Sequence, residues 1–368
     1  MISFLKRETV FCIALLAALV SALFNPPSAE WAGYPDYRTL ALLFCLMGVS
    51  EGLKASGMFA YVGDRLERGS GNVRRLSFLL VAIVFVSSMF FTNDVALLMF
   101  VPFTLLIMDR EKMDEGYIIR LVVIETIAAN LGSMTTPVGN PQNIYICSFF
   151  DMDAGSFFST ILPYSAASAV LVAVCCILFL SQKRTLDKDA HEEDTPVDRR
   201  RTGVYLTFLL LALMAVFKVL DWRILFFAEL AYLVIFDRRI LASIDYILLL
   251  TFVCFFVFSG NMKSIPVVSA VLTGPMQEHP IAVSALVSQV ISNVPAAILL
   301  SPFATGPEGV LVGTDIGGLG TPVASLASLI SLKFYFSRNG GAKGRYLLVF
   351  TLLNFALLAI LAALSIFL

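Results

Sequence analysis

The chain has 368 residues, of which 58% are hydrophobic and only 14% are charged, with a mean hydropathy of +0.85. Soluble domains carry about a quarter charged residues, so this composition excludes an ordinary soluble enzyme and a disordered chain. Lys and Arg number 26 against 27 Asp and Glu, which gives no basic field for nucleic acid. The length allows about ten spans of ~20 residues. We therefore predict an all-α, polytopic membrane protein in contact with lipid.

Apolar segments follow one another along the whole chain, and several are too short to cross a bilayer. They lie near residues 8–24, 37–62, 76–91, 95–108, 117–149, 157–181, 204–220, 222–236, 244–273, 281–291, 295–303, 310–333 and 346–367. The short pairs around Thr92-Asn93-Asp94 and Ser292-Asn293-Val294 predict two re-entrant helical hairpins, over 76–108 and 281–303. Non-helical tips at membrane depth persist only where protein or a wet cavity surrounds them.

Two longer segments, 117–149 and 310–333, contain clusters of Gly, Thr and Pro. Residues 132–141 hold two prolines and residues 313–322 hold four glycines, which a continuous helix does not accommodate. We predict a broken helix in each segment. The alternative to a functional break is a simple kink or a tight helix crossing, because Gly and Pro are common in membrane helices.

Basic residues gather in the connectors 63–75, 182–202, 237–239 and 337–345. All of these lie on one side if the two hairpins re-enter from opposite sides, and the positive-inside rule makes that side cytoplasmic. The N-terminus is then cytoplasmic, and the setting is a bacterial inner (plasma) membrane. The polar stretch 182–203 is a cytoplasmic linker between a first repeat (1–181) and a second part (204–368) that holds a connector helix and the second repeat.

The two parts resemble each other in sequence. An offset of 200 aligns Asn93 with Asn293 and the following Pro-Phe pairs, and an offset of 185 aligns Gly132 with Gly317 and the two Thr-Pro-Val triplets. Ser and Lys also recur between 50–54 and 259–263. Because the hairpins open in opposite directions, these matches predict an inverted-topology repeat. Secondary transporters use such repeats, with the substrate at the midplane.

The tips and breaks supply the candidate binding groups. Freed carbonyls can ligate a cation, half-helix N-termini attract an anion, and Asn amides can do either. For substrate we select Thr92, Asn93, Ser133, Thr136, Asn140, Asn143, Ser292, Asn293, Gly318, Thr321 and Pro322. For sodium or a proton we select Asn93, Asp94, Gly132, Asn293, Asp315 and Gly317, with Glu125 as a further acid.

Charges inside spans are expensive and usually functional. Asp94 is expected at a hairpin tip and Asp315 in a helix break, and we favour Asp94 as the ligand of the coupling ion. As alternatives, Asn93 and Asn293 only cap helices, Asp94 does the same, and Glu125 is a structural acid. Glu51 and Lys54 have the spacing of an i,i+3 pair. Glu229 and Lys263 receive no role.

These motifs resemble the ion transporter superfamily, which includes divalent-anion/sodium symporters, arsenite permeases, NhaD-type sodium/proton antiporters and citrate–metal carriers. The resemblance rests on the two tips, on residues 139–143 and on Gly320-Thr321-Pro322. The symporters carry Ser-Asn-Thr at both tips, whereas the Asn-Asp pair here is more similar to the arsenite permease and NhaD branches. The resemblance implies a homodimer held by a scaffold region, and a transport region of hairpins and broken helices that moves as an elevator.

The leading hypothesis is a secondary active transporter of a small anion or oxyanion, coupled to sodium or protons. A sodium/proton antiporter of the same fold is the alternative, and an anion channel fits an inverted repeat less well. The chain contains no Walker motif, nucleophile elbow or HExxH, so an ATP-driven pump and an embedded enzyme are not expected. Apart from a sodium ion, no cofactor is expected.

Overall fold

The computed structural model of the protein describes residues 8–182, 184–186, 196–338 and 341–367. Within these residues every regular element is a helix, and only an isolated bridge joins Asn72 to Thr185. The first half contains α2 (Thr9–Ser21), η1 (Ala29–Gly33), α3 (Tyr37–Ala55), α4 (Met58–Gly69), α5 (Val73–Phe91), α6 (Asn93–Arg110), α7 (Glu115–Ser133), α8 (Pro141–Phe149) and α9 (Ala154–Phe179). The second half contains α10 (Arg199–Val216), α11 (Trp222–Phe236), α12 (Arg238–Ser243), α13 (Tyr246–Lys263), α14 (Pro266–Glu278), α15 (Pro280–Ile291), α16 (Asn293–Leu300), η3 (Ser301–Phe303), α17 (Pro307–Ile316), α18 (Leu326–Ser337) and α19 (Lys343–Leu364).

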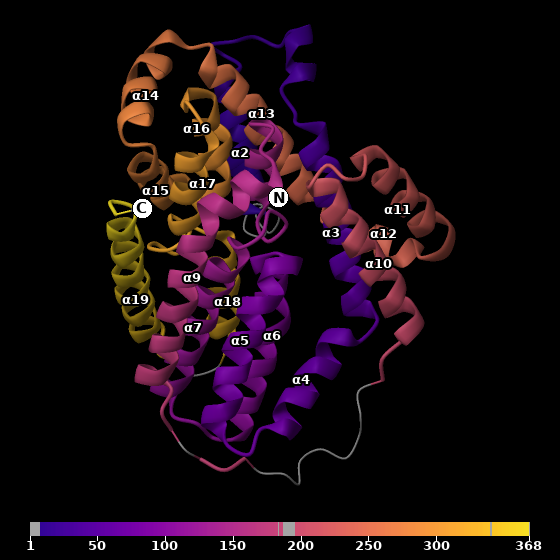
Figure 1. Ribbon diagram of the computed structural model, residues 1–368, viewed down its shortest axis with the longest axis vertical. Coiled ribbons are helices and arrows are strands. Elements are labelled where there is room, and N and C mark those ends of the chain that lie inside the picture. The colour runs from indigo at the N-terminus through magenta and orange to yellow at the C-terminus, as the bar shows by residue number, and fades with distance from the viewer. Residues whose placement is uncertain (1–7, 183, 187–195, 339–340, 368) are drawn as a thin grey trace.

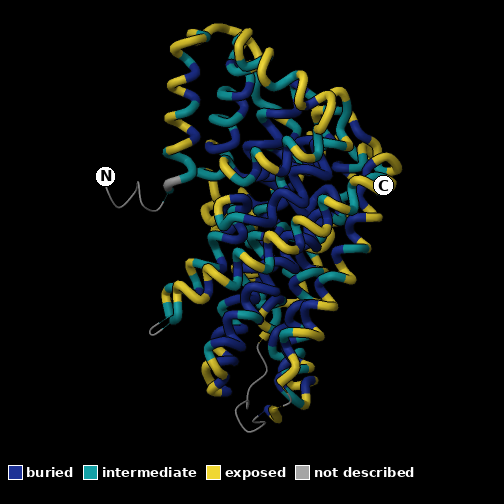
Figure 2. Tube along the Cα trace, turned by 90° about the vertical axis from the view of Figure 1, so that its left-hand side faces the viewer, coloured by how far each residue is buried: buried dark blue, intermediate teal, exposed yellow. Residues whose placement is uncertain are grey.

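Five of these helices are long and apolar enough to span a membrane, namely α5, α7, α9, α13 and α19, and the bent pair α3–α4 adds a sixth candidate. Helix α7 is buried along nearly its whole length, so it forms the centre of the bundle, whereas most of α19 faces outward. Figure 2 shows buried segments through the middle of the molecule and exposed turns around its outside. The predicted all-α, multi-span membrane fold is confirmed.

The two hairpins turn at a single residue, not at the three residues expected from sequence. Thr92 (φ 62°) separates α5 from α6, and Ser292 (φ 73°) separates α15 from α16. The predicted tips were too wide because each Asn already begins the second helix. Its side-chain oxygen accepts the next backbone N–H, from Asp94 at 2.9 Å and from Val294 at 3.0 Å, and so replaces one of the missing helix bonds.

Both predicted broken helices are interrupted: the first break is shorter than expected, and the second begins and ends a few residues later. The first consists of α7 and α8 with a break over 134–140, and the second of α17 and α18 with a break over 317–325. Asp315 therefore lies in the last turn of α17, and Gly132 lies in α7, so neither is in a break. Glycine lowers helix propensity without ending a helix, whereas the residue before a proline avoids the α-conformation.

Each hairpin packs on the broken helix of its own half through the same backbone contact. The Asn93 N–H donates to the Gly139 carbonyl at 3.3 Å, and the Asn293 N–H donates to the Ala324 carbonyl at 2.9 Å. The donors differ by the offset of 200 and the acceptors by the offset of 185 that align the two sequences. The equivalent residues thus occupy equivalent positions.

A side-chain contact repeats in the same way. The Thr136 hydroxyl donates to the Met89 carbonyl, and the Thr321 hydroxyl donates to the Gln289 carbonyl at 2.9 Å. These pairs obey the same two offsets. The threonines of the Thr-Pro-Val triplets therefore fasten each break to the last turn of the neighbouring hairpin helix.

The hairpins open toward opposite ends of the molecule. Hairpin 1 (α5 and α6) has its base where the Val73 N–H bonds to the Arg184 carbonyl, at 2.8 Å, and where Arg338 pairs with Asp109 just before α19 begins. Hairpin 2 (α15, α16 and η3) has its base beside the far end of α19, where a cavity is lined by His279, Thr305 and Ser365. Figure 1 shows α5 and α6 in the lower half of the molecule and α16 in the upper half.

Close packing between hairpin 1 and α7 depends on Gly132. A Cβ atom added there would lie 2.2 Å from the Phe85 carbonyl oxygen and 2.5 Å from Ser88 Oγ. We expect Gly132→Ala to destabilise the protein by about 1–3 kcal/mol or more, because backbone cannot move aside as a flexible side chain does. Thermal unfolding in detergent measures this loss. Gly69→Ala is the control, since a Cβ there meets nothing within 4 Å. Equal melting temperatures for the two variants would contradict the expectation.

Candidate functional site

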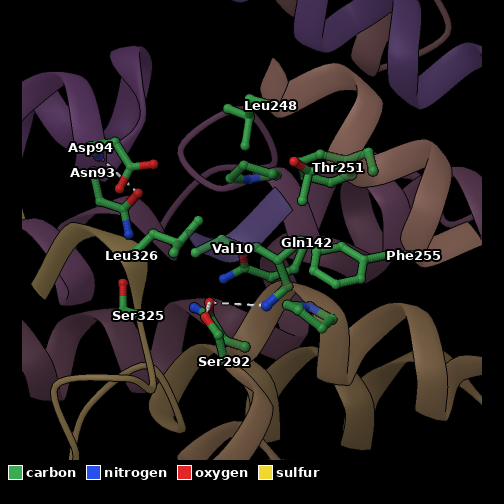
Figure 3. Close-up of a pocket in the computed structure, with 15 residues that line it drawn as sticks. Val10, Asn93, Asp94, Gln142, Leu248, Thr251, Phe255, Ser292, Ser325 and Leu326 are labelled. Atoms are coloured by element: carbon green, nitrogen blue, oxygen red, sulfur yellow. Dashed lines mark hydrogen bonds between the residues drawn. The ribbon is translucent and has the colours of Figure 1, made fainter. Parts of the chain in front are cut away.

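The tips of both hairpins meet at one small cavity of about 30 Å³. Its lining consists of Val10, Asn93, Asp94, Pro141, Gln142, Leu248, Thr251, Phe252, Phe255, Ser292, Asn293, Val294, Pro295, Ser325 and Leu326. Figure 3 shows Asn93 and Asp94 on one side of this cavity and Thr251 and Phe255 on the other. The sequence predicted that Asn93 and Asn293 lie close together, and both line this cavity.

One side of the cavity is built from helix beginnings. Asn93, Pro141, Asn293 and Leu326 are the first residues of α6, α8, α16 and α18, and all four line the cavity. The positive dipole ends of four helices therefore converge on one small space, and the first two N–H groups of α6 and of α16 are already bonded within the protein. Such an arrangement favours an anion or an electron-rich oxygen.

The other side is apolar and comes from helices outside the hairpins and breaks. Val10 of α2 and four residues of α13 (Leu248, Thr251, Phe252 and Phe255) complete the lining. Helices α2 and α13 also pack closely on each other. No Lys or Arg lines the cavity among the described residues, so amides, hydroxyls and the Asp94 carboxylate supply its polarity.

The two acids selected from sequence have different surroundings. Asp94 lines the cavity, and its Oδ1 is buried without a hydrogen-bond partner among the described residues. Asp315 is buried behind the cavity, where its Oδ1 accepts from Asn140 Nδ2 at 3.3 Å and from Gln142 Nε2 at 3.2 Å. The carboxylate of Asp94 is thus open to a ligand, whereas that of Asp315 is compensated by amide donors.

Asn143 also reaches Asp315. In one orientation its amide nitrogen lies 3.4–3.5 Å from the Met134 and Thr136 carbonyls, and in the other it donates to Asp315 Oδ1 at 2.9 Å. The second orientation gives the shorter, charge-assisted bond, so we assign that one. Three amides of the segment 140–143 then surround one carboxylate of the other half.

Asn130, which aligns with Asp315, makes the reciprocal contacts. Its Oδ1 accepts from Asn93 Nδ2 at 3.0 Å and from Ser325 Oγ at 2.8 Å, and its Nδ2 donates to Ser328 Oγ at 3.2 Å. Ser325 and Ser328 align with Asn140 and Asn143 at the offset of 185. The end of each broken helix is therefore bonded to the segment that follows the break in the other half.

The remaining predicted residues shape the site without lining the cavity. Ser133 bonds back to the Asn130 carbonyl at 2.9 Å, and Thr136 and Thr321 hold the breaks to the hairpins. Gly318 lies against Asn293, because a Cβ there would be 3.0 Å from the Asn293 nitrogen. Others lie at the tip or in the breaks: Thr92, Gly317 and Pro322. Their part in binding stays a prediction.

The other intramembrane charges lie apart from the cavity. Glu125 is fully buried, and its Oε1 accepts from Thr104 Oγ1 at 2.6 Å. Glu229 is fully buried on α11, next to the Cys45 thiol. Glu51 and Lys54 form the predicted i,i+3 pair at 3.5 Å, and Lys263 lies in the last turn of α13.

Sequence reasoning missed four parts of the site. Asn130 and Ser325 were present in the repeat alignment but were not selected, and Gln142 lies between two residues that were. Their contacts across the halves were the missing information. The lining residues of α2 and α13 could not be recognised from the sequence. An apolar residue that closes a cavity cannot be told from any other residue of a membrane helix.

A helical bundle with two opposed hairpins whose tips meet at a small cavity is typical of an integral, multi-pass membrane transport protein. Residues 1–327 match the CitMHS family, described as citrate transporter, and the chain belongs to that family. The predicted membership in the ion transporter superfamily is thereby confirmed.

Relatives of known name agree with this class. The inner membrane protein YbiR of Escherichia coli (strain K12) is 29% identical over 342 residues, covering 91% of this chain and 90% of its own length. An uncharacterized transporter of Methanocaldococcus jannaschii is 28% identical over 85% of each chain. A silicon efflux transporter of Oryza sativa subsp. japonica is 34% identical over 152 residues, which are 41% of this chain and 30% of the relative. These names agree with a membrane transporter.

Proposed function

We propose that this chain moves a small anion or oxyanion across the membrane, coupled to sodium or protons, by an elevator-type mechanism. The observation that supports this best is the cavity itself. Its polar side consists of hairpin tips and segments next to the breaks, and its apolar side of α2 and α13. A substrate there lies at the boundary between two sets of helices, where movement of one set past the other would carry it.

The chemistry of the lining supports a small, weakly charged substrate over a tricarboxylate. Carboxylates are usually bound by Arg, and no Arg or Lys lines the cavity among the described residues. A water molecule needs about 10–15 Å³ of such space, so a cavity of about 30 Å³ holds only a few atoms in this conformation. The family description gives citrate and the rice relative's name gives silicon as cargo. The lining fits a small oxyanion or oxyacid better than citrate.

For the coupling ion we propose Asp94 as the principal ligand. An acid at this depth must be neutralised by a cation, a proton or a partner. Asp315 has its partners in three amides, whereas Asp94 Oδ1 has none among the described residues and lines the same cavity as Asn93 and Asn293. The sodium ion, if it is the coupling ion, is the only cofactor we propose.

A sodium/proton antiporter is the second candidate, and the same carboxylate supports it. Asp94 exchanging a cation for a proton would need no organic substrate. The polar groups of hairpin 2, including Ser292 and Asn293, would then have no cargo to bind. Anion-driven flux separates the two candidates, since an antiporter responds to a pH or sodium gradient alone.

The cavity also divides the helices into a proposed moving part and a proposed fixed part. We propose that α5–α8 and α15–α18 form the transport region and that α2, α3, α10, α11 and α13 form the scaffold, through which two copies associate. We place the N-terminus in the cytoplasm and the chain in the inner membrane. The support for this orientation is that hairpin 1 has its base among basic connectors, beside Arg184 and Arg338.

A thermal-shift screen of the purified protein tests the substrate class. Small oxyanions and citrate are added separately, each with and without sodium and at two pH values. A ligand present at a hundred times its Kd adds about 2.7 kcal/mol, which raises the melting temperature by about 5 °C or more. We expect such a shift from a small oxyanion and none from citrate. Stabilisation by citrate alone would overturn the substrate proposal.

A further inference from the structure

A second cavity, of about 500 Å³, lies between the beginning of α10 and the junction of α11 with α12. It is lined by Asp198, Arg200, Arg201, Val204, Tyr232, Phe236, Asp237 and Arg239. None of these residues lines the cavity at the hairpin tips. Figure 1 shows α10, α11 and α12 grouped at one side of the molecule. We call this cavity the arginine cleft.

Both acids of the arginine cleft are already satisfied within the protein. Arg201 binds Asp237 through two nitrogens, at 3.0 Å from Nε and 2.7 Å from Nη2, and the Tyr205 hydroxyl donates to the same carboxylate at 2.7 Å. Asp198 accepts the Arg201 backbone N–H at 3.0 Å as the cap of α10. Arg201 therefore compensates the charge of Asp237, whereas Asp198 keeps its charge, and three arginines against two acids leave the lining with one net positive charge.

Two cations remain. The exposed side chains of Arg200 and Arg239 make no hydrogen bond or ion pair with any described residue, and both line the arginine cleft. They come from two different elements, the first turn of α10 and α12. Guanidinium groups that approach one space from two sides suit a phosphate, which accepts several N–H bonds at once.

The rest of the surroundings is apolar. Tyr232 and Phe236 pack on each other, with ring centroids 5.5 Å apart, and both line the arginine cleft. Beside them on α11, Phe236 is 74% exposed and Ile235 is 65% exposed, as expected of a helix that faces acyl chains. A soluble anion needs no such apolar border, whereas a phospholipid presents a phosphate and hydrocarbon together.

We propose that the arginine cleft binds the headgroup of an anionic phospholipid, with its phosphate on Arg200 and Arg239 and its acyl chains along α11. Anionic lipids concentrate in the leaflet that basic protein segments face. The bound lipid would join α10 to α12 and so stabilise helices that pack on α3. This proposal does not depend on what the transporter carries.

The test uses purified full-length protein in mild detergent, with phosphatidylglycerol or phosphatidylcholine added. Lipid binding is counted by native mass spectrometry, and stability is read as the melting temperature. Each Arg near a lipid surface contributes about 1 kcal/mol, so Arg200→Gln/Arg239→Gln should weaken phosphatidylglycerol binding about 30-fold. Each single variant should weaken it about fivefold, which keeps the test usable if the double variant folds poorly.

The control is Arg223→Gln/Lys263→Gln, which removes the same charge from two basic residues outside the arginine cleft. It should bind phosphatidylglycerol as the unmodified protein does. The proposal fails if the control loses as much binding as the cleft variants, or if phosphatidylcholine binds equally well. It also fails if inorganic phosphate stabilises the protein as much as phosphatidylglycerol does, because the site would then belong to a soluble anion.

Discussion

Asp94→Asn should abolish the dependence of transport on sodium or pH. The substitution keeps the size of the side chain but removes its charge. That charge belongs to a carboxylate that lines the cavity and whose Oδ1 has no hydrogen-bond partner among the described residues. A cation held by that carboxylate would lose its one anionic ligand in the lining, and we expect its affinity to fall about 10-fold to 100-fold, the equivalent of one or two charge-assisted bonds. Flux into proteoliposomes, measured against sodium and pH, shows the change.

Asp221→Asn is the matched control for this experiment. Asp221 caps α11 from an exposed connector, and Asn preserves that cap. The control should keep normal ion dependence. If Asp94→Asn keeps it as well, the coupling ion is held by backbone carbonyls, amides and hydroxyls, and our assignment of Asp94 is wrong.

Asn293→Ala should abolish transport while leaving a folded protein. The Asn293 oxygen caps α16, but its nitrogen has no hydrogen-bond partner among the described residues and lies at the substrate cavity. Loss of an amide that donates to the substrate should cost about 1–3 kcal/mol, or about 5-fold to 150-fold in substrate affinity. Substrate-dependent thermal shifts and flux both report this loss.

Asn293→Asp separates binding from capping. Asp accepts the Val294 N–H as Asn does, so it restores the cap, but it lacks the amide donor and repels an anion. We expect Asn293→Asp to keep the cap but to be less stable than the unmodified protein, because it buries a carboxylate without a partner, and to be as inactive as Asn293→Ala. Normal transport by Asn293→Asp would reduce this residue to a helix cap.

Asn93→Ala should also stop transport, since it removes the bond to Asn130.

The matched contacts of the two halves were predictable, because the donor residues that make them are identical at aligned positions of the sequence. The pairs Asn93 and Asn293, and Thr136 and Thr321, occupy matched contacts in the two halves, as the alignment offsets indicate. Hairpin limits were predictable to within a few residues, since apolar runs end where polar tips begin. Each tip was predicted to span three residues instead of one. The sequence does not reveal that the side chain of Asn93 or Asn293 replaces a missing backbone hydrogen bond and so begins the second helix.

The environment of each acid was not predictable. Asp315 was aligned with Asn130 and expected in a helix break, yet amides from the other half surround it. That arrangement depends on two segments about 175 residues apart in the chain, and neither segment alone indicates its partner. The apolar side of the cavity was missed for the same reason. Its α13 residues are part of the site only because they lie opposite the hairpin tips, and the sequence does not show that position.

The reciprocal bonds between the halves also set an order for biosynthesis. Asn140 and Gln142 bond to a carboxylate made 175 and 173 residues later, and Asn130 to a serine made 195 residues later. While only the first half has left the ribosome, these amides sit in the membrane without their partners, which is costly unless water or the insertion machinery satisfies them. Completion of the core must therefore wait for residues 307–328. A chain terminated before them would present unpaired amides at membrane depth, as a target for proteolytic quality control.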